Sequence, residues 1–266
     1  MKSTALTEFL RRIAPLFCLL AVSVFAAAQS SPLKICLLSA SAEYESDKSL
    51  SAFQSLLESR YRVECQRAFG KDKGDGLPGL EALATADLMI VFTRRVNLPP
   101  AQLALLKHYL AGGKPVLGLR TASHAFQNYP EFDKDILGGG YKGHYTNSQV
   151  AVGIATGRSA HPVLAGVSTF TSRKLYKNPT LADDVVVLLE GTTANIREPL
   201  AWTRHRPQGR VFYTSLGTPE DFTEESFRRC LSTPSSGPRN EMKSHSVSQH
   251  PTANEPGFSL EPQLLV

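Results

Sequence analysis

The chain has few cysteines, and none lies in a setting typical of catalysis. Four of its 266 residues are cysteine, and Cys36, Cys65 and Cys230 are those beyond the amino-terminal segment. An odd number of thiols defines no disulfide framework. Cys36 and Cys65 fall in predicted strands, where a buried, unreactive thiol is the common role. The sequence therefore favours neither a disulfide-stabilised fold nor a cysteine enzyme.

Signatures of nucleic-acid, dinucleotide and metal binding are also missing. No run of five basic residues occurs, and the net charge of +5 falls to about +3 without residues 1–28. No G-x-G-x-x-G pattern follows the first predicted strand. The histidines that could share a site, His124, His144, His161 and His205, lack the close spacing of zinc ligands. A metal site would require them to converge in the fold, so we expect no nucleic acid, metal or cofactor.

No apolar run here is a comfortable membrane-spanning helix. The run Ile13–Phe25 follows Lys2 and Arg11-Arg12 and precedes Ala26-Ala27-Ala28. This order of charged, apolar and small residues is typical of a signal peptide, and the apolar part is short for a bilayer. We expect residues 1–28 to be removed, which leaves a secreted or periplasmic protein without a stable membrane span. An uncleaved anchor is the alternative.

The remaining chain predicts one α/β domain. With 42% hydrophobic and 20% charged residues, its composition is that of an ordinary globular protein. Apolar runs at residues 33–39, 61–66, 87–93 and 115–119 predict strands, and helical spacing follows two of them. Repeated strand–helix–strand units predict a doubly wound, mostly parallel sheet.

The pattern changes beyond residue 144. Residues 148–155 and 184–190 predict further strands, and residues 199–203 and 209–216 predict an added antiparallel hairpin before a helix at 219–231. From residue 232 to 266 the chain is rich in Ser, Pro, Asn, Glu and His. Such a segment has little apolar surface to bury. We therefore expect a domain over residues 29–231 and a disordered or diverged tail.

Two turns between Lys114 and His144 are the best candidates for a site. The strand at 115–119 ends in the polar corner Arg120–His124, and residues 138–144 form a glycine-rich loop that presents His144. Ligands of α/β sheets bind at the carboxyl ends of parallel strands, and glycines let a backbone approach closely. The loop after the first strand, which contains Glu43, should share this edge.

Several segments together resemble the trehalose-utilization (ThuA-like) family. They are Gly118–His124, Leu137–His144, His161–Gly166, Leu175-Tyr176, Pro199–Arg204 and Gly209–Gly217. The resemblance extends over roughly residues 33–231. It implies a class I glutamine-amidotransferase-like fold with a flavodoxin-like core and a link to carbohydrate metabolism.

The chain departs from the family pattern at three places. Amidotransferases of this fold have Gly-x-Cys-x-Gly at the corner, and ThuA-like relatives often have Gly-x-His-Ser, whereas this chain has Arg120. The acidic pair that commonly precedes Leu-Tyr is replaced by Ser172-Arg173-Lys174, and a family histidine is replaced by Thr218. Because arginine stays protonated and is no nucleophile, we expect no cysteine-dependent amidotransferase activity.

For catalysis we predict His144 as general acid/base, Glu43 as second proton carrier and Arg120 as the stabiliser of an enediolate-like oxyanion. His124, Ser123 and Tyr176 are predicted to face the substrate. Structural alternatives remain open: a salt bridge from Arg120 to Glu43 or Asp47, a loop-anchoring role for His161, and a packing role for Tyr176.

We expect the protein to act on a small-molecule sugar or keto-sugar by isomerase- or epimerase-type acid–base chemistry. The alternative is a non-catalytic carbohydrate-binding or scaffolding module that has lost the amidotransferase nucleophile. The oligomeric state does not follow from the sequence.

Overall fold

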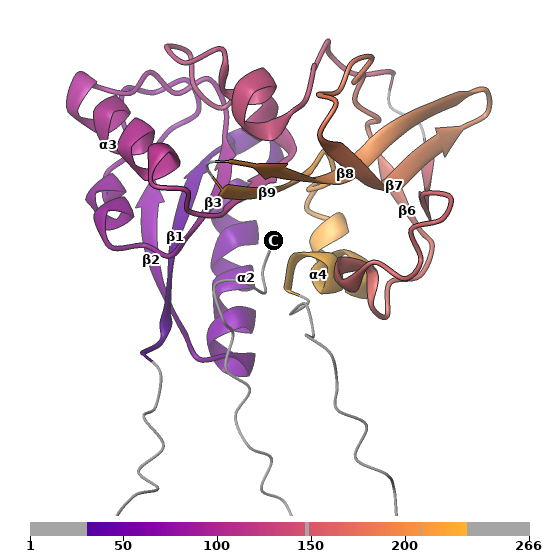
Figure 1. Ribbon diagram of the computed structural model, residues 1–266, viewed down its shortest axis with the longest axis horizontal. Coiled ribbons are helices and arrows are strands. Elements are labelled where there is room, and N and C mark those ends of the chain that lie inside the picture. Colours follow the sequence, from indigo (N-terminus) through magenta and orange to yellow (C-terminus); the bar gives the residue numbers. More distant parts are fainter. Residues whose placement is uncertain (1–30, 147–148, 208, 233–266) are drawn as a thin grey trace, which may run out of the picture. The chain divides into compact units, whose positions relative to one another are not determined.

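The computed structural model describes residues 31–146, 149–207 and 209–232 (Figure 1). The chain divides into residues 1–31 and 32–266, and the domain described below belongs to the second unit. The expected signal peptide lies outside the described residues, and so does the expected tail apart from its first residue, Ser232, which is helical.

Within the described residues, nine strands form one sheet in the order β2-β1-β3-β4-β9-β8-β7-β5-β6. The strands are β1 (Leu33–Ala40), β2 (Val63–Phe69), β3 (Leu88–Thr93), β4 (Val116–Leu119), β5 (Gln149–Ile154), β6 (Phe170–Arg173), β7 (Val185–Thr193), β8 (Ile196–Arg206) and β9 (Gly209–Thr214). All pairings from β2 to β9 in this order are parallel, and all pairings from β9 to β6 are antiparallel.

Helices cover both faces of the sheet (Figure 1). The α-helices are α2 (Ser46–Arg60), α3 (Pro100–Ala111) and α4 (Glu225–Ser232), and a π-helix spans Phe132–Leu137. Side chains of β1 alternate between the two faces: Ile35 and Leu37 pack with α2 and α4, whereas Cys36 and Leu38 pack with α3. Two apolar cores therefore hold the central strands, which explains their continuous apolar sequences.

The structure is a mixed α/β sheet, with the predicted hairpin present as β8 and β9. The expectation of a mostly parallel sheet was wrong, because half of the strand pairings are antiparallel. Between residues 149 and 206 no α-helix intervenes between strands. The connections from β7 to β8 and from β8 to β9 are very short, and strands joined in this way pair antiparallel, since a parallel pair needs a long crossover. The short edge strand β6 was not predicted.

Side-chain hydrogen bonds decide how two of the helices begin. Ser46 does not cap α2: its Oγ lies 2.7 Å from Ser39 Oγ and accepts a hydrogen bond from Ser41 N at 2.8 Å, which ties the helix to the end of β1. The last helix begins at Glu225 rather than at residue 219, because Asp221 accepts from the backbone of Gly217 and holds that segment in a turn. None of the described helices has the length and apolar character to span a bilayer.

Candidate functional site

The loops after β1, β2, β3, β4 and β6 lie along one edge of the sheet, which we call the carboxyl edge. Every non-glycine residue of the described chain with a left-handed backbone belongs to one of these loops. They are Glu45 (φ 47°), Lys73 (φ 55°), Arg95 (φ 50°), Arg120 (φ 43°) and Lys174 (φ 58°). Such conformations cost about 1–3 kcal/mol each and cluster at functional sites. The strain therefore marks the carboxyl edge as the candidate site.

Backbone hydrogen bonds join these loops to one another. The N–H of Lys73 donates to the Arg94 carbonyl at 3.0 Å, and the N–H of Arg95 donates to the His124 carbonyl at 2.8 Å. The loop after β3 is thereby fixed between the loop after β2 and the corner after β4. This arrangement holds polar side chains from three loops in one place.

Arg120 begins the corner after β4 and is completely buried. Its Nη1 donates to the Ser215 carbonyl, and its Nη2 donates to the Lys174 carbonyl at 3.1 Å. The guanidinium carbon lies 4.2 Å from the ring centroid of Tyr44 and 4.7 Å from that of Tyr176. Two aromatic faces and two carbonyls therefore stabilise this cation.

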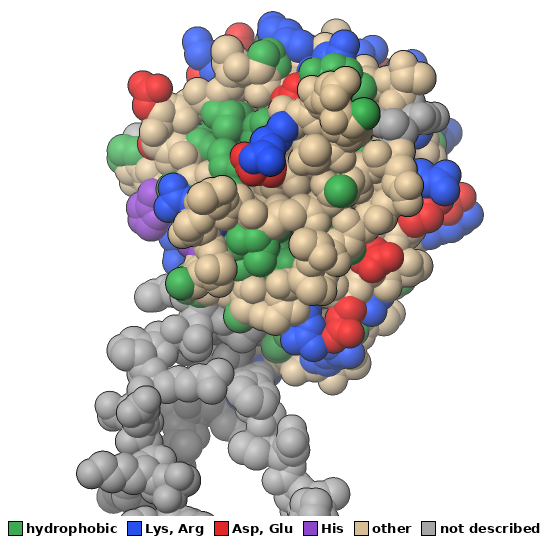
Figure 2. All heavy atoms as spheres, turned by 90° about the vertical axis from the view of Figure 1, so that its right-hand side faces the viewer, with side chains coloured by type: hydrophobic (Ala, Val, Ile, Leu, Met, Phe, Trp, Pro, Cys, Tyr) green, Lys and Arg blue, Asp and Glu red, His purple; other side chains and the backbone are tan. Residues whose placement is uncertain are grey.

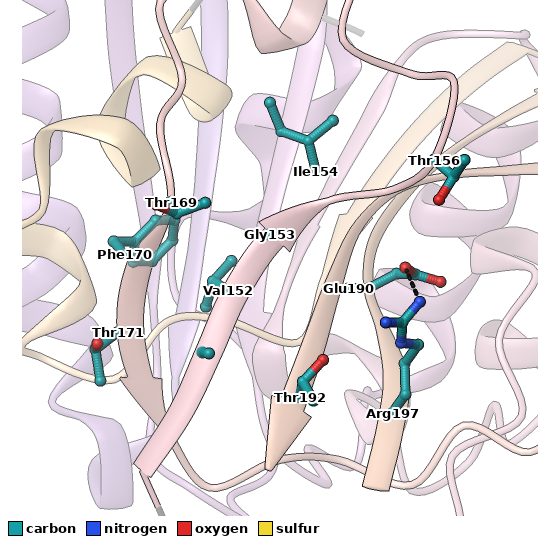
Figure 3. A pocket seen from close by; sticks show the side chains of 11 residues that line it. Val152, Gly153, Ile154, Thr156, Thr169, Phe170, Thr171, Glu190, Thr192 and Arg197 are labelled. Atoms are coloured by element: carbon teal, nitrogen blue, oxygen red, sulfur yellow. Dashed lines mark hydrogen bonds and ion pairs between the residues drawn. The ribbon is translucent and has the colours of Figure 1, made fainter. Parts of the chain in front are cut away.

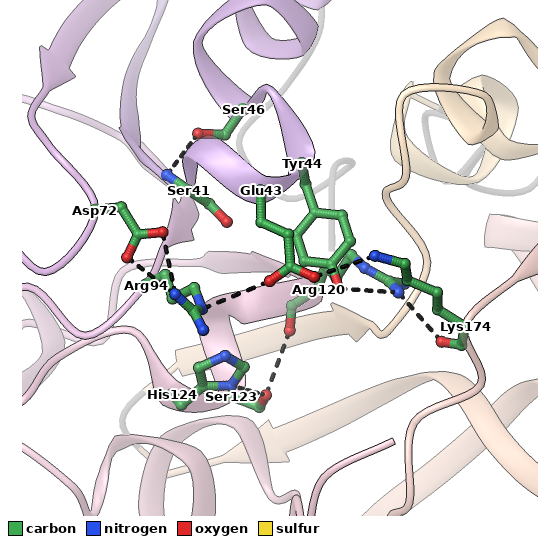
Figure 4. Close-up of polar contacts among 10 residues, drawn as sticks. All are labelled: Ser41, Glu43, Tyr44, Ser46, Asp72, Arg94, Arg120, Ser123, His124 and Lys174. Carbon is green, nitrogen blue, oxygen red and sulfur yellow. Dashed lines mark hydrogen bonds and ion pairs between the residues drawn. The ribbon is translucent and has the colours of Figure 1, made fainter. Parts of the chain in front are cut away.

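The alternative of a salt bridge from Arg120 to Glu43 or Asp47 was wrong. Glu43 instead pairs with Lys174 at 3.1 Å and with Arg94 at 3.9 Å, and Arg94 also reaches Asp72 at 3.2 Å (Figure 4). Partial burial acts to raise the pKa of Glu43, but hydrogen bonds from Lys174 and Tyr44 and the two nearby cations lower it overall. Glu43 is therefore ionised and engaged at neutral pH.

His124 lies at the end of the same corner, with its ring stacked on Tyr141 at 4.6 Å between centroids and 6.3 Å from Tyr176. Its Nδ1 lies 3.1 Å from Ser123 Oγ, which donates to the Arg120 carbonyl at 3.3 Å. In the tautomer that is compatible with the serine–carbonyl bond, Nδ1 donates to the serine oxygen. Nε2 is left as an acceptor with no hydrogen-bond partner among the described residues.

The imidazole of His124 is neutral at physiological pH. Burial is the main cause that lowers its pKa to about 4, and the charges of Arg95 and Arg94 add to the effect. A neutral ring with a bare Nε2 can accept a proton or a hydrogen bond from a ligand. Burial likewise keeps the Tyr176 hydroxyl protonated by raising its pKa.

Ser123, His124 and Tyr141 line a pocket of about 530 Å³. Asp133, from the π-helix, also lines it and is only 8% exposed. Oδ2 of Asp133 accepts from the Tyr141 N–H at 2.9 Å, whereas Oδ1 is buried without a partner among the described residues. Burial therefore raises the pKa of Asp133 to about 6, against the smaller opposing effects of this hydrogen bond and of Lys142.

The glycine-rich loop closes one side of the pocket, and two of its glycines, Gly139 and Gly140, lie against other parts of the protein. A Cβ on Gly139 would collide with Asp133 Oδ1, and one on Gly140 would collide with Thr180 Oγ1 and lie 2.7 Å from the Thr180 carbonyl. The close approach that glycine permits is made to the protein itself. Gly139 helps to bury Asp133, and this burial raises the pKa of its carboxyl.

The structure brings together five of the six predicted site residues. Arg120, Ser123, His124 and Tyr176 are in contact through the corner, and Glu43 lies beside them through Lys174. His144 differs: its backbone pairs with Tyr176, but its side chain is exposed and Nδ1 donates to the Tyr145 carbonyl at 2.9 Å.

Five further residues at the site were not predicted from the sequence. They are Tyr44, Arg94, Arg95, Asp133 and Tyr141. Arg94 and Arg95 directly follow the most apolar strand, so the rule that placed the corner after β4 could have found them. Nothing in the pattern around Asp133 indicates a buried carboxyl.

No three His, Cys, Asp or Glu side chains of the described chain are grouped so as to hold a metal ion. The three cysteines of the described chain are free, and burial raises the pKa of Cys36, Cys65 and Cys230 to about 12. None is therefore a nucleophile at neutral pH.

A second pocket, of about 470 Å³, lies on the antiparallel half (Figure 3). It is lined mainly by threonines and apolar side chains of β5, β6 and β7, and its charged pair, Glu190 and Arg197, is joined at 3.3 Å. Figure 2 shows this end of the molecule, where uncharged side chains and backbone predominate near the middle. The pocket contains no histidine and no residue of the carboxyl edge, so the first pocket is the better candidate.

The family model for ThuA, described as trehalose utilisation, matches residues 34–233, and the chain therefore belongs to the ThuA family. Membership implies a carbohydrate-related role. No curated protein matches the chain.

Solved structures with this fold include two ThuA-like proteins. One, from Bacteroides uniformis, has a TM-score of 0.59 at 18% identity and covers 77% of this chain and 90% of its own. The other, from Parabacteroides merdae, has a TM-score of 0.57 at 18% identity, and the match covers 75% of this chain and 87% of that protein. A β-galactosidase from Rahnella sp. R3 has a TM-score of 0.51 at 10% identity, over 82% of this chain and 34% of that enzyme. At these identities the likeness shows the fold alone.

Proposed function

We propose that this ThuA-family protein binds a sugar or keto-sugar derivative in the pocket beside His124 and converts it by acid–base chemistry. The observation that carries the proposal is the pair His124 and Asp133 in one pocket, with their pKa values moved in opposite directions. In enzymes, neighbouring titratable groups whose environments separate their pKa values in this way typically serve as catalytic acid and base.

Isomerisation or epimerisation of a keto-sugar moves a proton from the carbon next to a carbonyl. Asp133, with a pKa of about 6, can take and return a proton near neutral pH. Neutral His124 would hold a hydroxyl of the sugar through Nε2, and the Tyr141 ring offers a flat face beside it. Arg120 would act through charge at a distance, since its guanidinium is enclosed by Tyr44 and Tyr176.

Deuterium exchange provides a direct test. Keto-sugars incubated with the protein in D₂O should lose the NMR signal of the C–H next to the carbonyl. His124→Gln and Asp133→Asn should slow this exchange about 100-fold or more. Glu131→Gln, at an exposed carboxylate just before the same π-helix and outside the pocket lining, should leave it unchanged. His144→Ala decides whether the predicted acid/base contributes, because that side chain lies outside the pocket.

A non-catalytic carbohydrate-binding module is the second candidate. The observation that favours it is Arg120, which fills the corner where amidotransferases of this fold carry a nucleophile. Sugar binding measured by calorimetry without exchange on any keto-sugar would support this candidate. Absence of both binding and exchange would refute both.

Two further features belong to the proposal. The order β2-β1-β3-β4-β9 of the parallel strands supports a flavodoxin-like core, which has the strand order 2-1-3-4-5. The order of residues in the amino-terminal segment supports export and cleavage before Gln29. Mass spectrometry of protein recovered from its native compartment tests this, and an intact amino terminus on a chain free of the membrane would contradict it.

A further inference from the structure

The carboxyl edge carries more positive than negative charge. Its loops include the cations Lys71, Lys73, Arg94, Arg95, Arg120 and Lys174 and, besides Glu45, the carboxylates Glu43, Asp72 and Asp75. Glu45 pairs with Lys48 at 3.0 Å, away from these cations.

The remaining carboxylates already have partners. Asp75 Oδ1 accepts a hydrogen bond from Asn97 Nδ2 at 3.1 Å. Glu43 contacts Lys174 and Arg94, and Asp72 contacts Arg94 (Figure 4). Neither Lys73 nor Arg95, whose side chains are exposed, forms an ion pair or side-chain hydrogen bond within the described chain. Lys73 and Arg95 are therefore available to a ligand.

Arg95 is the better placed of the two. Its backbone N–H donates to the His124 carbonyl at 2.8 Å, so the residue is fixed directly beside the candidate ligand-binding histidine. Its charge is the largest electrostatic contribution, after burial, to the lowered pKa of His124. The backbone of Arg95 is strained at φ 50°, a conformation that glycine or asparagine adopts at lower cost. An exposed arginine in this conformation gains no stability within the chain, but it provides a fork for an anion.

We propose that the sugar bound at this site carries an anionic group, a carboxylate or a phosphate, and that Arg95 together with Arg94 binds it next to His124. This inference rests on the proposed function and narrows its substrate class to acidic sugar derivatives. Arg94 keeps its orientation through Asp72, and Arg95 supplies the unpaired charge. The neutral part of the sugar lies against His124 and Tyr141.

Calorimetric titrations with glucuronate, glucose 6-phosphate, glucose and inorganic phosphate test the inference. At least one acidic sugar should bind 10-fold or more tightly than glucose, and added salt should reduce that preference. If glucuronate binds more tightly than glucose 6-phosphate, the anionic group is a carboxylate. If glucose 6-phosphate binds more tightly, it is a phosphate. Inorganic phosphate should compete with the acidic sugar but not with glucose.

Arg95→Asn should reduce the preference for the acidic sugar to about threefold or less, and the variant should fold because asparagine tolerates a left-handed backbone. Arg95→Lys, which keeps the charge, should retain part of the preference. Arg60→Gln is the control: it removes one positive charge from the exposed carboxyl-terminal end of α2. This variant should retain the full preference for the acidic sugar.

Different results would separate this inference from the proposed function. Glucose binding as tight as that of both acids, or a preference that survives Arg95→Asn, would overturn the inference alone. Failure of every sugar to bind the wild-type protein would overturn the proposed function as well.

Discussion

Replacing Asp133 with asparagine should make the protein increasingly stable relative to wild type as the pH rises from 5 to 7. The Asp133 carboxyl is 8% exposed, and burial raises its pKa from an ordinary 3.8 to about 6. In the unfolded chain the same carboxyl titrates at its ordinary value. Between these two pKa values the unfolded state loses its proton first, so the stability of the wild-type protein falls as the pH rises.

The size of the effect follows from the shift in pKa. A shift of about two pKa units corresponds to about 3 kcal/mol of the free energy of unfolding. The folded protein is destabilised by this full amount above pH 6, and not at all below pH 3.8. Between pH 5 and pH 7 the cost grows by about 1 kcal/mol. Asparagine carries no charge at any pH, and its carbonyl can still accept from the Tyr141 N–H. A constant penalty of about 1–3 kcal/mol for its unpartnered amide would displace the curve without changing its slope.

Urea unfolding of wild type, Asp133→Asn and Asp135→Asn at pH 5, 6 and 7 measures this slope. Asp135 is an exposed carboxylate on the same π-helix and controls for a general change in charge. A difference between wild type and Asp133→Asn that does not change with pH would refute the reasoning. The same slope in Asp135→Asn would refute it equally.

Three more substitutions or treatments have defined outcomes. Gly140→Ala should destabilise the protein by about 1–3 kcal/mol in the same urea titration, because the new methyl group collides with Thr180. Gly153→Ala is the control: its methyl group meets open space, and the substitution should be nearly neutral. Arg120→Lys should lower the free energy of unfolding by about 1–3 kcal/mol, since lysine cannot reproduce both carbonyl contacts and the stacking on two rings; an unchanged urea midpoint would contradict this role. Iodoacetamide at pH 7.5 should modify the thiols of Cys36, Cys65 and Cys230 far more slowly in the native protein than in urea, because burial raises each pKa to about 12. Mass spectrometry measures the modification, and a cysteine that reacts in the native protein at the rate of a free thiol would contradict this prediction.

The parts of the fold and site that could be predicted depend on local pattern. Strands β3 and β4 are buried on both faces, so their sequences are continuous apolar runs that one can identify without a structure. Once parallel strands are expected, their carboxyl ends share an edge, which is why Arg120, His124 and Glu43 were predicted to lie near one another.

Other features depend on contacts between distant segments. Asp133 is buried by Gly139 and bonded by Tyr141, and no periodic pattern surrounds the π-helix that carries it. The glycine-rich loop was expected to approach a ligand, but its neighbours are Asp133 and Thr180 of the same chain. A sequence shows that a backbone can approach something closely; it does not show what lies there.

The position of β9 has a consequence for how the chain is made. This strand lies between β4 and β8 and joins the parallel and antiparallel parts, yet it is the last strand of the described chain. The ribosome therefore releases β4 about 90 residues before its partner, a delay of about 5–20 s at ordinary rates of translation. During that time the exposed edge of β4 can pair with another nascent chain. A product that stops before residue 209 should accordingly aggregate rather than fold as a smaller domain.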